Sequence, residues 1–297
     1  MHSTESAQSQ HAGLDEYDTP KLVSTLVADH QQAVAAVQRA EPELVRAVDA
    51  AVVRLQQGGR LLYLGAGTSG RLGVLDGVEL TPTFHWPADR ALGFIAGGRQ
   101  AMFAAVEFAE DDVELGAKDV QQAQVSSLDV VILLAASGAT PYVLGALRAA
   151  RSAGALTIGL ANNTGAPVTR EAEIGITLDT GPEVISGSTR LKAGTAQKIA
   201  LNSLSSAIMV RLHKVHGNLM VDVQANNHKL RGRAVQLVVR LAGVDDSAAQ
   251  QALEANGWRV KTAVVALKLG LDGVRADAHL ARFHGRLRTA METAPSV

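Results

Sequence analysis

Apolar residues recur along this chain in two patterns, one typical of amphipathic helices and one typical of buried strands. An apolar stripe at helical spacing runs over residues 20–40, and a second over 42–57 ends at Gly58-Gly59, a common helix stop. Short and almost continuously apolar runs follow, each ending in a turn of small or polar residues. We predict strands over 60–64, 92–96, 129–135, 155–160 and 173–178.

Helical patterns separate these strands, notably over 100–122 and 141–153. Strands that alternate with helices predict an α/β fold with a mostly parallel sheet flanked by helices. From Arg190 onward we expect no further strands. The predicted helices there cover 192–212, 222–242, 247–256, 260–269 and 273–287.

The pattern also predicts how the chain is divided. Residues 1–18 are polar and are expected to form a flexible N-terminal arm. The N-terminal helices and the sheet make one α/β domain over 19–243. A change of pattern near Gly243 suggests a small all-helical C-terminal unit over 244–297.

Composition narrows the class of function. With 47% hydrophobic and 19% charged residues the chain can bury a full core, and a net charge of −1 without a basic run argues against nucleic-acid binding. No stretch reaches the ~20 apolar residues of a membrane span, and residues 1–10 lack the apolar core of a signal peptide. The absence of Cys excludes disulfides, thiolate chemistry and Cys-ligated zinc. We expect a cytoplasmic protein with a small-molecule partner.

The first predicted strand stops in a glycine-rich turn, GAGTSG over residues 65–70. Such a turn, followed by a helix N-terminus, exposes N–H groups that can bind a pyrophosphate or a single phosphate. Gly67 lets the backbone turn, while Thr68 and Ser69 supply hydroxyls that suit a compact oxyanion. The G-x-G-x-x-G pattern alone does not separate a dinucleotide from a phosphosugar.

A second turn of the same kind follows the strand over 129–135. Ser137, Gly138 and Thr140 lie where they could contact a phosphate, although Thr140 could equally be a simple helix N-cap. Two hydroxyl-rich turns from one sheet can enclose one sugar phosphate. A dinucleotide enzyme would need an acid at the end of the second strand, and Asp89 precedes the next predicted strand instead.

Two carboxylates are candidates for acid–base chemistry. Glu79 has apolar neighbours, and Glu110 follows the turn at 97–98; the alternative for each is a solvated acid at a helix end. Lys192 opens a long helix and could reach an anion, or it could be solvated. His213 and His216 have the one-turn spacing of metal ligands, but a third ligand is not nearby, so we expect neither a metal nor a nucleotide cofactor.

These segments resemble the N-acetylmuramic acid 6-phosphate etherases, which belong to the sugar isomerase (SIS) domain superfamily. The resemblance begins near Thr4 and covers most of the chain. It is strongest in LGAGTSGRLG (64–73), GTAQK (194–198), GPEVI (181–185) and GNLMVDV (217–223).

The resemblance implies a SIS fold, a homodimer and no cofactor. It implies cleavage of the D-lactyl ether of N-acetylmuramic acid 6-phosphate to N-acetylglucosamine 6-phosphate and D-lactate, in cell-wall amino-sugar recycling. In that reaction Glu79 is the acid and Glu110 the base, and the two turns hold the phosphosugar. The sequence departs from the family around Glu79, at Phe108, where Gly is usual, and at Ala139, where Arg is usual.

Two other functions remain as alternatives. A phosphosugar-sensing regulatory protein could have the same fold without etherase activity. A nicotinamide-linked dehydrogenase would use the first glycine turn alone, which the second hydroxyl-rich turn disfavours.

Overall fold

The computed structural model describes residues 3–223, 225 and 227–295, and the chain in it forms two compact units. The first unit runs through Val78 and resumes over Ala88–Ile208. The second contains Glu79–Pro87 and the chain from Met209 onward. The division between them therefore lies earlier than the predicted boundary at 243/244, inside the long helix α8 (Lys192–Arg211).

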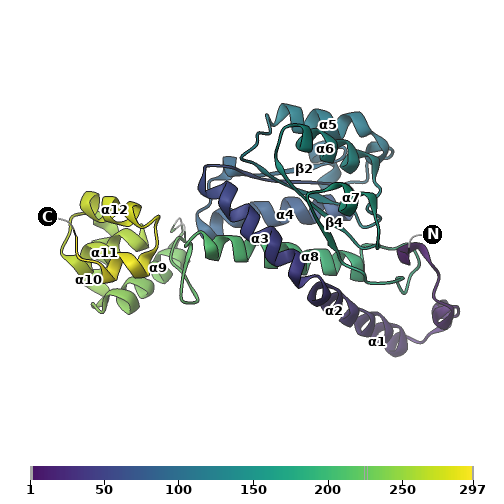
Figure 1. Cartoon of the computed structure of the whole chain (residues 1–297). Coiled ribbons are helices and arrows are strands. Elements are labelled where there is room, and N and C mark those ends of the chain that lie inside the picture. Colours follow the sequence, from purple (N-terminus) through teal and green to yellow (C-terminus); the bar gives the residue numbers. More distant parts are fainter. Residues whose placement is uncertain (1–2, 224, 226, 296–297) are drawn as a thin grey trace. The chain divides into compact units, whose positions relative to one another are not determined.

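A five-stranded parallel sheet forms the centre of the first unit, which confirms the predicted α/β fold (Figure 1). The order of the strands is β2-β1-β3-β4-β5, so the chain crosses from β2 over β1 to reach β3. Each strand begins within one or two residues of its prediction. They are β1 (Leu61–Gly65), β2 (Ala91–Ile95), β3 (Val130–Leu134), β4 (Leu156–Ala161) and β5 (Ile174–Thr177).

Helices cover both faces of this sheet, which explains why its central strands read as continuous apolar runs. On one face Leu62 and Leu64 of β1 join the core under α6 (Pro141–Ser152), beside α5 (Val113–Gln122). Figure 1 shows α3 (Glu41–Gln56) and α8 on the other face. There the Tyr63 hydroxyl donates to Asp76 of α4 (Gly67–Phe84) at 3.0 Å, and Ser205 of α8 donates to the same carboxylate at 3.2 Å.

Two predicted helices of this unit differ from the observed ones. The helix over 20–40 is interrupted at His30, between α1 (Thr19–Asp29) and α2 (Gln31–Arg39), although His30 keeps right-handed helical dihedrals. The helix over 100–122 is wrong in its first half. Phe108 has a φ of 61°, which breaks a helix, and Asp112 caps the start of α5 by accepting from Leu115 N at 2.9 Å.

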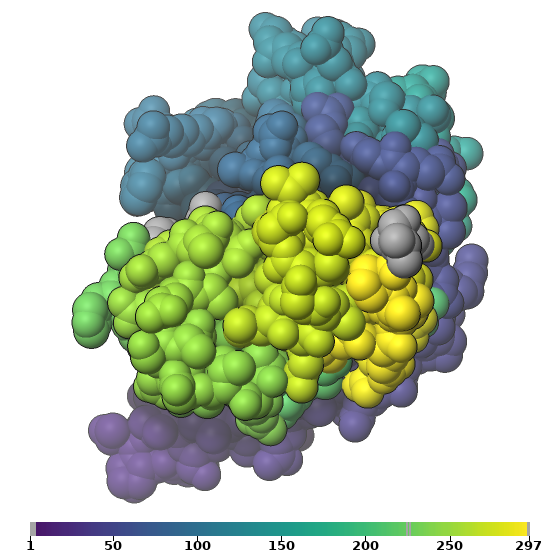
Figure 2. Space-filling view, turned by 90° about the vertical axis from the view of Figure 1, so that its left-hand side faces the viewer, coloured from purple at the N-terminus to yellow at the C-terminus, as the bar shows by residue number. Residues whose placement is uncertain are grey.

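The second unit has a core of its own, built from α9 to α13, which Figure 2 shows in green to yellow. The prediction of no strands after Arg190 is wrong, because β6 (Val215–His216) and β7 (Leu219–Met220) form a short antiparallel hairpin. The helix predicted from 222 starts at 228, after the Asn227 side chain that caps it. The helices are α9 (His228–Ala242), α10 (Asp246–Ala255), α11 (Val260–Leu269), α12 (Gly273–Arg282) and α13 (Leu287–Glu292).

Among the described residues, no helix combines the length and the apolar character of a membrane-spanning segment.

Candidate functional site

The carboxyl ends of β1 and β3 form the point where the sheet changes direction. From β1 the chain moves outward to β2 and then returns to β3 on the other side of β1. Gly65 and Leu134, the last residues of the two strands, are partners in the register, so both following loops start at the same level. In open parallel sheets, ligands bind in the crevice that such a switch point opens.

The loop after β1 leads directly into the N-terminus of α4. Gly67 has a φ of 52°, a left-handed conformation that favours glycine and starts the helix at once. Thr68 and Ser69 lie in the first helical turn, and Ser69 is only 7% exposed. Free N–H groups and the positive end of the helix dipole make this turn suitable for an anion.

The loop after β3 presents two more hydroxyls. Gly138 has a φ of 72°, and a Cβ there would lie 2.3 Å from Ala166 Cβ, so only glycine fits. The Ser137 and Thr140 hydroxyl oxygens are 3.5 Å apart. Thr140 occupies the N-cap of α6, yet its side chain makes no capping hydrogen bond to a described residue. Its hydroxyl is therefore not consumed by the capping role.

Both loops open into one cavity of about 420 Å³ in the first unit. Of the predicted site residues it brings together Gly67, Thr68, Ser69, Ser137, Thr140 and Glu110 in its lining. Ala139 also lines it, where the family usually has an arginine. The cavity is a size that suits a small ligand such as a sugar phosphate.

Glu110 reaches this cavity from the short 3-10 helix η6 (Ala109–Asp111). Asp111 lines the cavity beside it, so two carboxylates face the hydroxyl-rich turns. The left-handed Phe108 directly precedes η6 and turns the chain into it. The carboxylates at the cavity wall and the two hydroxyl-rich turns are thus within the same unit.

Glu79 and Lys192 do not line the cavity. Glu79 is exposed on α4 and belongs to the second unit. Lys192 is fully buried, and its Nζ lies 2.8 Å from Asp29 Oδ1 and 3.2 Å from Gln32 Oε1. The ammonium of Lys192 therefore ties α8 to α1 and α2.

Glu183 binds the N-terminus of α8. Its carboxylate accepts from the backbone N–H groups of Lys192 at 3.2 Å and Ala193 at 2.9 Å. Burial raises the pKa of the Glu183 carboxyl, against the opposing effect of these two hydrogen bonds. The buried Glu183 carboxylate therefore caps the N-terminus of α8, and it does not line the cavity.

The N-terminal segment contributes a cavity residue that the sequence did not predict. Thr4 is fully buried, its N–H donates to Asn163 Oδ1 at 3.2 Å, and Asn163 Nδ2 donates back to Thr4 Oγ1 at 3.0 Å. The Ser186 hydroxyl donates to the carbonyl of Glu5 at 3.0 Å, and Glu5 lines the cavity. No periodic pattern could reveal this, since Thr4 and Asn163 are 159 residues apart.

Curated relatives match this chain along most of its length. An N-acetylmuramic acid 6-phosphate etherase of Deinococcus radiodurans is 57% identical over 97% of this chain and 94% of its own. One of Serratia proteamaculans, with the same name, is 47% identical over 94% of each chain.

Two further similarities concern parts of the chain. The family model "Glucokinase regulatory protein N-terminal SIS domain" matches residues 43–151. A solved Bacteroides fragilis protein, described as a phosphosugar isomerase involved in capsule formation, has a TM-score of 0.50 and 16% identity. The match covers 66% of this chain and 94% of that one, and it supports the SIS-type fold.

Proposed function

We propose that this chain, which belongs to the family of N-acetylmuramic acid 6-phosphate etherases, cleaves the D-lactyl ether of that substrate. The products are N-acetylglucosamine 6-phosphate and D-lactate, and the enzyme is a carbon–oxygen lyase of cell-wall amino-sugar recycling. The observation that carries the site is the single cavity shared by two hydroxyl-rich turns and Glu110.

An ether is a poor leaving group, so the reaction proceeds by elimination. In the open-chain sugar the aldehyde acidifies the proton on the adjacent carbon. A base removes this proton, the carbon–oxygen bond to lactate breaks, and an acid protonates the departing oxygen. Water then adds to the unsaturated sugar. A well-placed acid or base contributes ~10²–10⁴-fold to such steps.

We assign the base to Glu110, because it lies in the cavity lining, and the acid to Glu79, because the family resemblance places it there. Asp111 lies next to Glu110 and adds negative charge on the same wall. The 6-phosphate fits the turn of Thr68 and Ser69, where the N-terminus of α4 points its N–H groups into the cavity wall. Ser137 and Thr140 bind from the second turn.

Glu5 closes this cavity from the N-terminal segment. Its carboxylate, like that of Glu110, would repel a second phosphate, so it favours a substrate with a single phosphate. We expect the reaction to take place in the cytoplasm, where a phosphorylated substrate is retained because a phosphate monoester does not cross a bilayer unaided.

A homodimer accounts for the position of Glu79. Glu79 follows two exposed apolar side chains on α4, Leu75 (42% exposed) and Val78 (63% exposed). Contact with water does not stabilise these side chains in a monomer, whereas burial against a second copy would. A contact between two copies over this face places Glu79 at the interface. Analytical ultracentrifugation of the wild type and of Val78→Glu measures the oligomeric state. We expect a dimeric wild type and a monomeric variant. A monomeric wild type would contradict the homodimer.

Release of D-lactate from N-acetylmuramic acid 6-phosphate tests the proposed function. We expect Glu110→Gln and Glu79→Gln to lower kcat by roughly 10²-fold or more, because a glutamine transfers no proton. Glu107→Gln is a matched control, since Glu107 is exposed and does not line the cavity. An unchanged rate in Glu110→Gln rules out Glu110 as the base.

Ser69→Ala separates binding from chemistry. We expect KM to rise about tenfold with kcat little changed, because the lost hydrogen bond to phosphate is present in the ground state as well. Tight substrate binding by the wild type without lactate release would instead identify a phosphosugar sensor.

A further inference from the structure

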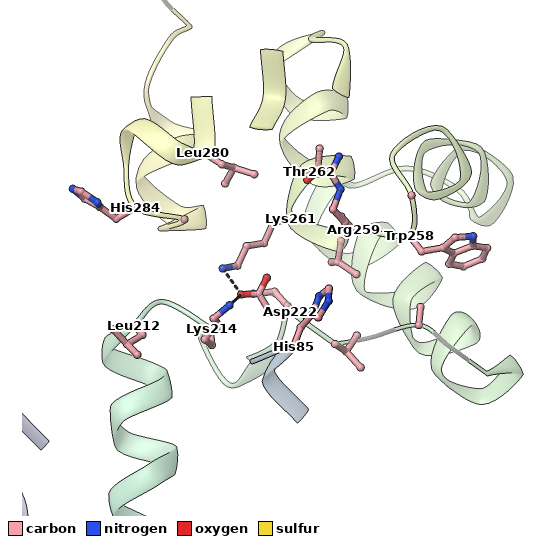
Figure 3. Close-up of a pocket in the computed structure, with 16 residues that line it drawn as sticks. His85, Leu212, Lys214, Asp222, Trp258, Arg259, Lys261, Thr262, Leu280 and His284 are labelled. Atoms are coloured by element: carbon pink, nitrogen blue, oxygen red, sulfur yellow. Dashed lines mark hydrogen bonds and ion pairs between the residues drawn. The ribbon is translucent and has the colours of Figure 1, made fainter. Parts of the chain in front are cut away.

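A second cavity lies in the second unit and shares no lining residue with the phosphosugar cavity. Its volume is about 600 Å³, within the range of small-molecule sites. It lies among the β6–β7 hairpin, the start of α11 and the turn after α12, with His85 from the 79–87 segment (Figure 3). None of the residues assigned to the etherase reaction lines this cavity.

Two lysines share a single carboxylate inside it. Figure 3 shows Lys261 and Lys214 meeting at Asp222. Both ammonium groups approach the same oxygen, Oδ2, at 2.8 Å for Lys261 and 3.1 Å for Lys214. The two ammonium groups carry two positive charges and the carboxylate of Asp222 carries one negative charge, so the three groups leave a net positive charge at the cavity wall.

The lysines also keep donor capacity. An ammonium carries three N–H groups. Those of Lys261 reach Asp222 and the carbonyl of His213, at 2.7 Å for the latter, and no third partner is found among the described residues. Burial lowers the pKa of Lys261, Asp222 raises it, and the charge of Lys214 lowers it further. An added anion would offset the repulsion between the two ammonium groups.

The surroundings do not neutralise this charge. Arg259 also lines the cavity, but it is paired with Asp277. Burial lowers the pKa of His213, and so do the cations around it, including Arg286 and Lys261. The neighbourhood of the cavity is therefore electropositive.

The backbone is strained at this cavity. Among the described residues six that are not glycine have positive φ, and three of them line it: His85 (50°), Trp258 (60°) and His284 (52°). A fourth, His213 (62°), provides the carbonyl that binds Lys261. Such conformations carry backbone strain, and they cluster at functional sites.

We propose that this cavity is a second ligand site, which binds the carboxylate or phosphate of a small molecule through Lys214 and Lys261. The charge imbalance selects an anion, and a lysine ammonium accepts either oxyanion. The shape of the cavity leaves room for a ligand larger than the anion itself. The competing explanation is that the lysines only fasten the hairpin to α11.

Tryptophan fluorescence reports on this site alone. The chain has two tryptophans, Trp86 and Trp258. Both belong to the second unit, Trp258 lines the cavity, and the Lys214 ammonium lies 6.0 Å from the centre of the Trp86 ring. We would titrate the full chain with inorganic phosphate and, separately, with D-lactate, against sodium chloride at equal ionic strength. The Ser69→Ala background weakens phosphate binding at the phosphosugar cavity, and comparison with Lys214→Met assigns any fluorescence change to the second unit.

A saturable fluorescence change with phosphate or D-lactate, and none with chloride, is expected, and the anion that saturates identifies the source. Lys214→Met should weaken it about tenfold, because a charged hydrogen bond is lost. Lys268→Met, an exposed lysine of α11 outside the cavity, should match the parent. Absence of saturation with either anion, or equal affinity in Lys214→Met, overturns the proposal.

The same set of variants also needs a control for correct folding. Lys214 is partly exposed, at 22% of its side chain, so its replacement should leave the circular dichroism spectrum intact. Lys261→Met provides a second variant, and it should weaken binding as well. If both variants lower only the melting temperature and bind as before, the lysines are structural and the site is excluded.

Discussion

Phe108 holds a backbone conformation that suits glycine better than any other residue. Its φ is 61°, and its side chain is 79% exposed, so the ring gains little from packing. A bulky residue in the left-handed region is strained, and strain of this kind costs of order 1 kcal/mol. The family resemblance places a glycine at the same position.

We predict that Phe108→Gly raises the free energy of unfolding by about 1 kcal/mol, since relief of the strain exceeds the entropic cost of glycine. Urea denaturation measures the change. Phe103→Gly is the control: Phe103 is similarly exposed, at 86%, but has a φ of −114°, so glycine should stabilise nothing there. Equal effects of the two substitutions would refute the strain argument.

Single polar residues show why residue type alone does not define a site. Ser137 and Thr140 face the cavity because they follow a strand end. Lys192 has the same kind of sequence context, at the start of a helix after a polar turn, yet its ammonium is bound to Asp29. The difference lies in α1, a partner from 163 residues away in the sequence.

At the scale of elements, Asp129 joins the beginnings of β1 and β3. Its Oδ1 accepts from Arg60 N at 2.9 Å, and its Oδ2 accepts from Arg60 Nη2 at 2.7 Å and from Ser126 N at 2.8 Å. Burial alone would raise the pKa of the Asp129 carboxyl. The hydrogen bonds to Arg60 and Ser126 outweigh burial and hold the pKa below its ordinary value.

Asp129→Asn should lower the free energy of unfolding at pH 7 by about 2 kcal/mol, because the charged hydrogen bonds to Arg60 are lost. A lowered folded-state pKa stabilises the protein above the unfolded pKa of about 3.9, and this stabilisation is lost as the pH falls through the folded value. The variant should therefore lose less stability on acidification than the wild type.

Urea unfolding at neutral pH and at low pH measures this difference. Asp49→Asn, at an exposed position of α3, should leave the pH dependence unchanged. A variant of Asp129 whose stability falls with acid as steeply as that of the wild type would show that the carboxylate is not the linked group.

At the scale of the whole molecule, the N-terminal segment completes a cavity built from the middle of the chain. Thr4 and Asn163 exchange two hydrogen bonds, and the N–H of Gly187 donates to the carbonyl of Thr4 at 3.2 Å. These contacts anchor the segment that carries Glu5.

Thr4→Val should raise KM for the phosphosugar several-fold, because it removes the hydroxyl that Asn163 binds and frees Glu5 from the cavity wall. The melting temperature should change little, since the segment adds few core residues. Ser9→Ala, an exposed serine of the same segment, is the control for the enzyme assay. A drop in kcat with KM unchanged would mean that the segment acts on the chemistry and not on enclosure.

Each of the two units buries its own set of apolar side chains. The helices α4 and α8 nevertheless run from the first unit into the second. A change of composition near Gly243 could not reveal this division, because the chain changes units inside a continuous helix.

By itself the sequence determined the five strands and the two turns. The strands are predictable because a strand covered on both faces must be apolar throughout, which is a local pattern. The shared position of the turns is predictable because parallel strands bring their carboxyl-end loops to one edge of the sheet. It did not determine the break at Phe108, the β6–β7 hairpin, the partner of Lys192 or the place of Glu5. The partner of Lys192 and the place of Glu5 were decided by contacts between segments far apart in the chain, whose free energy leaves no periodic signal in the residues that make them. The break at Phe108 and the two-residue strands β6 and β7 are local, but they are too short to show a periodic pattern.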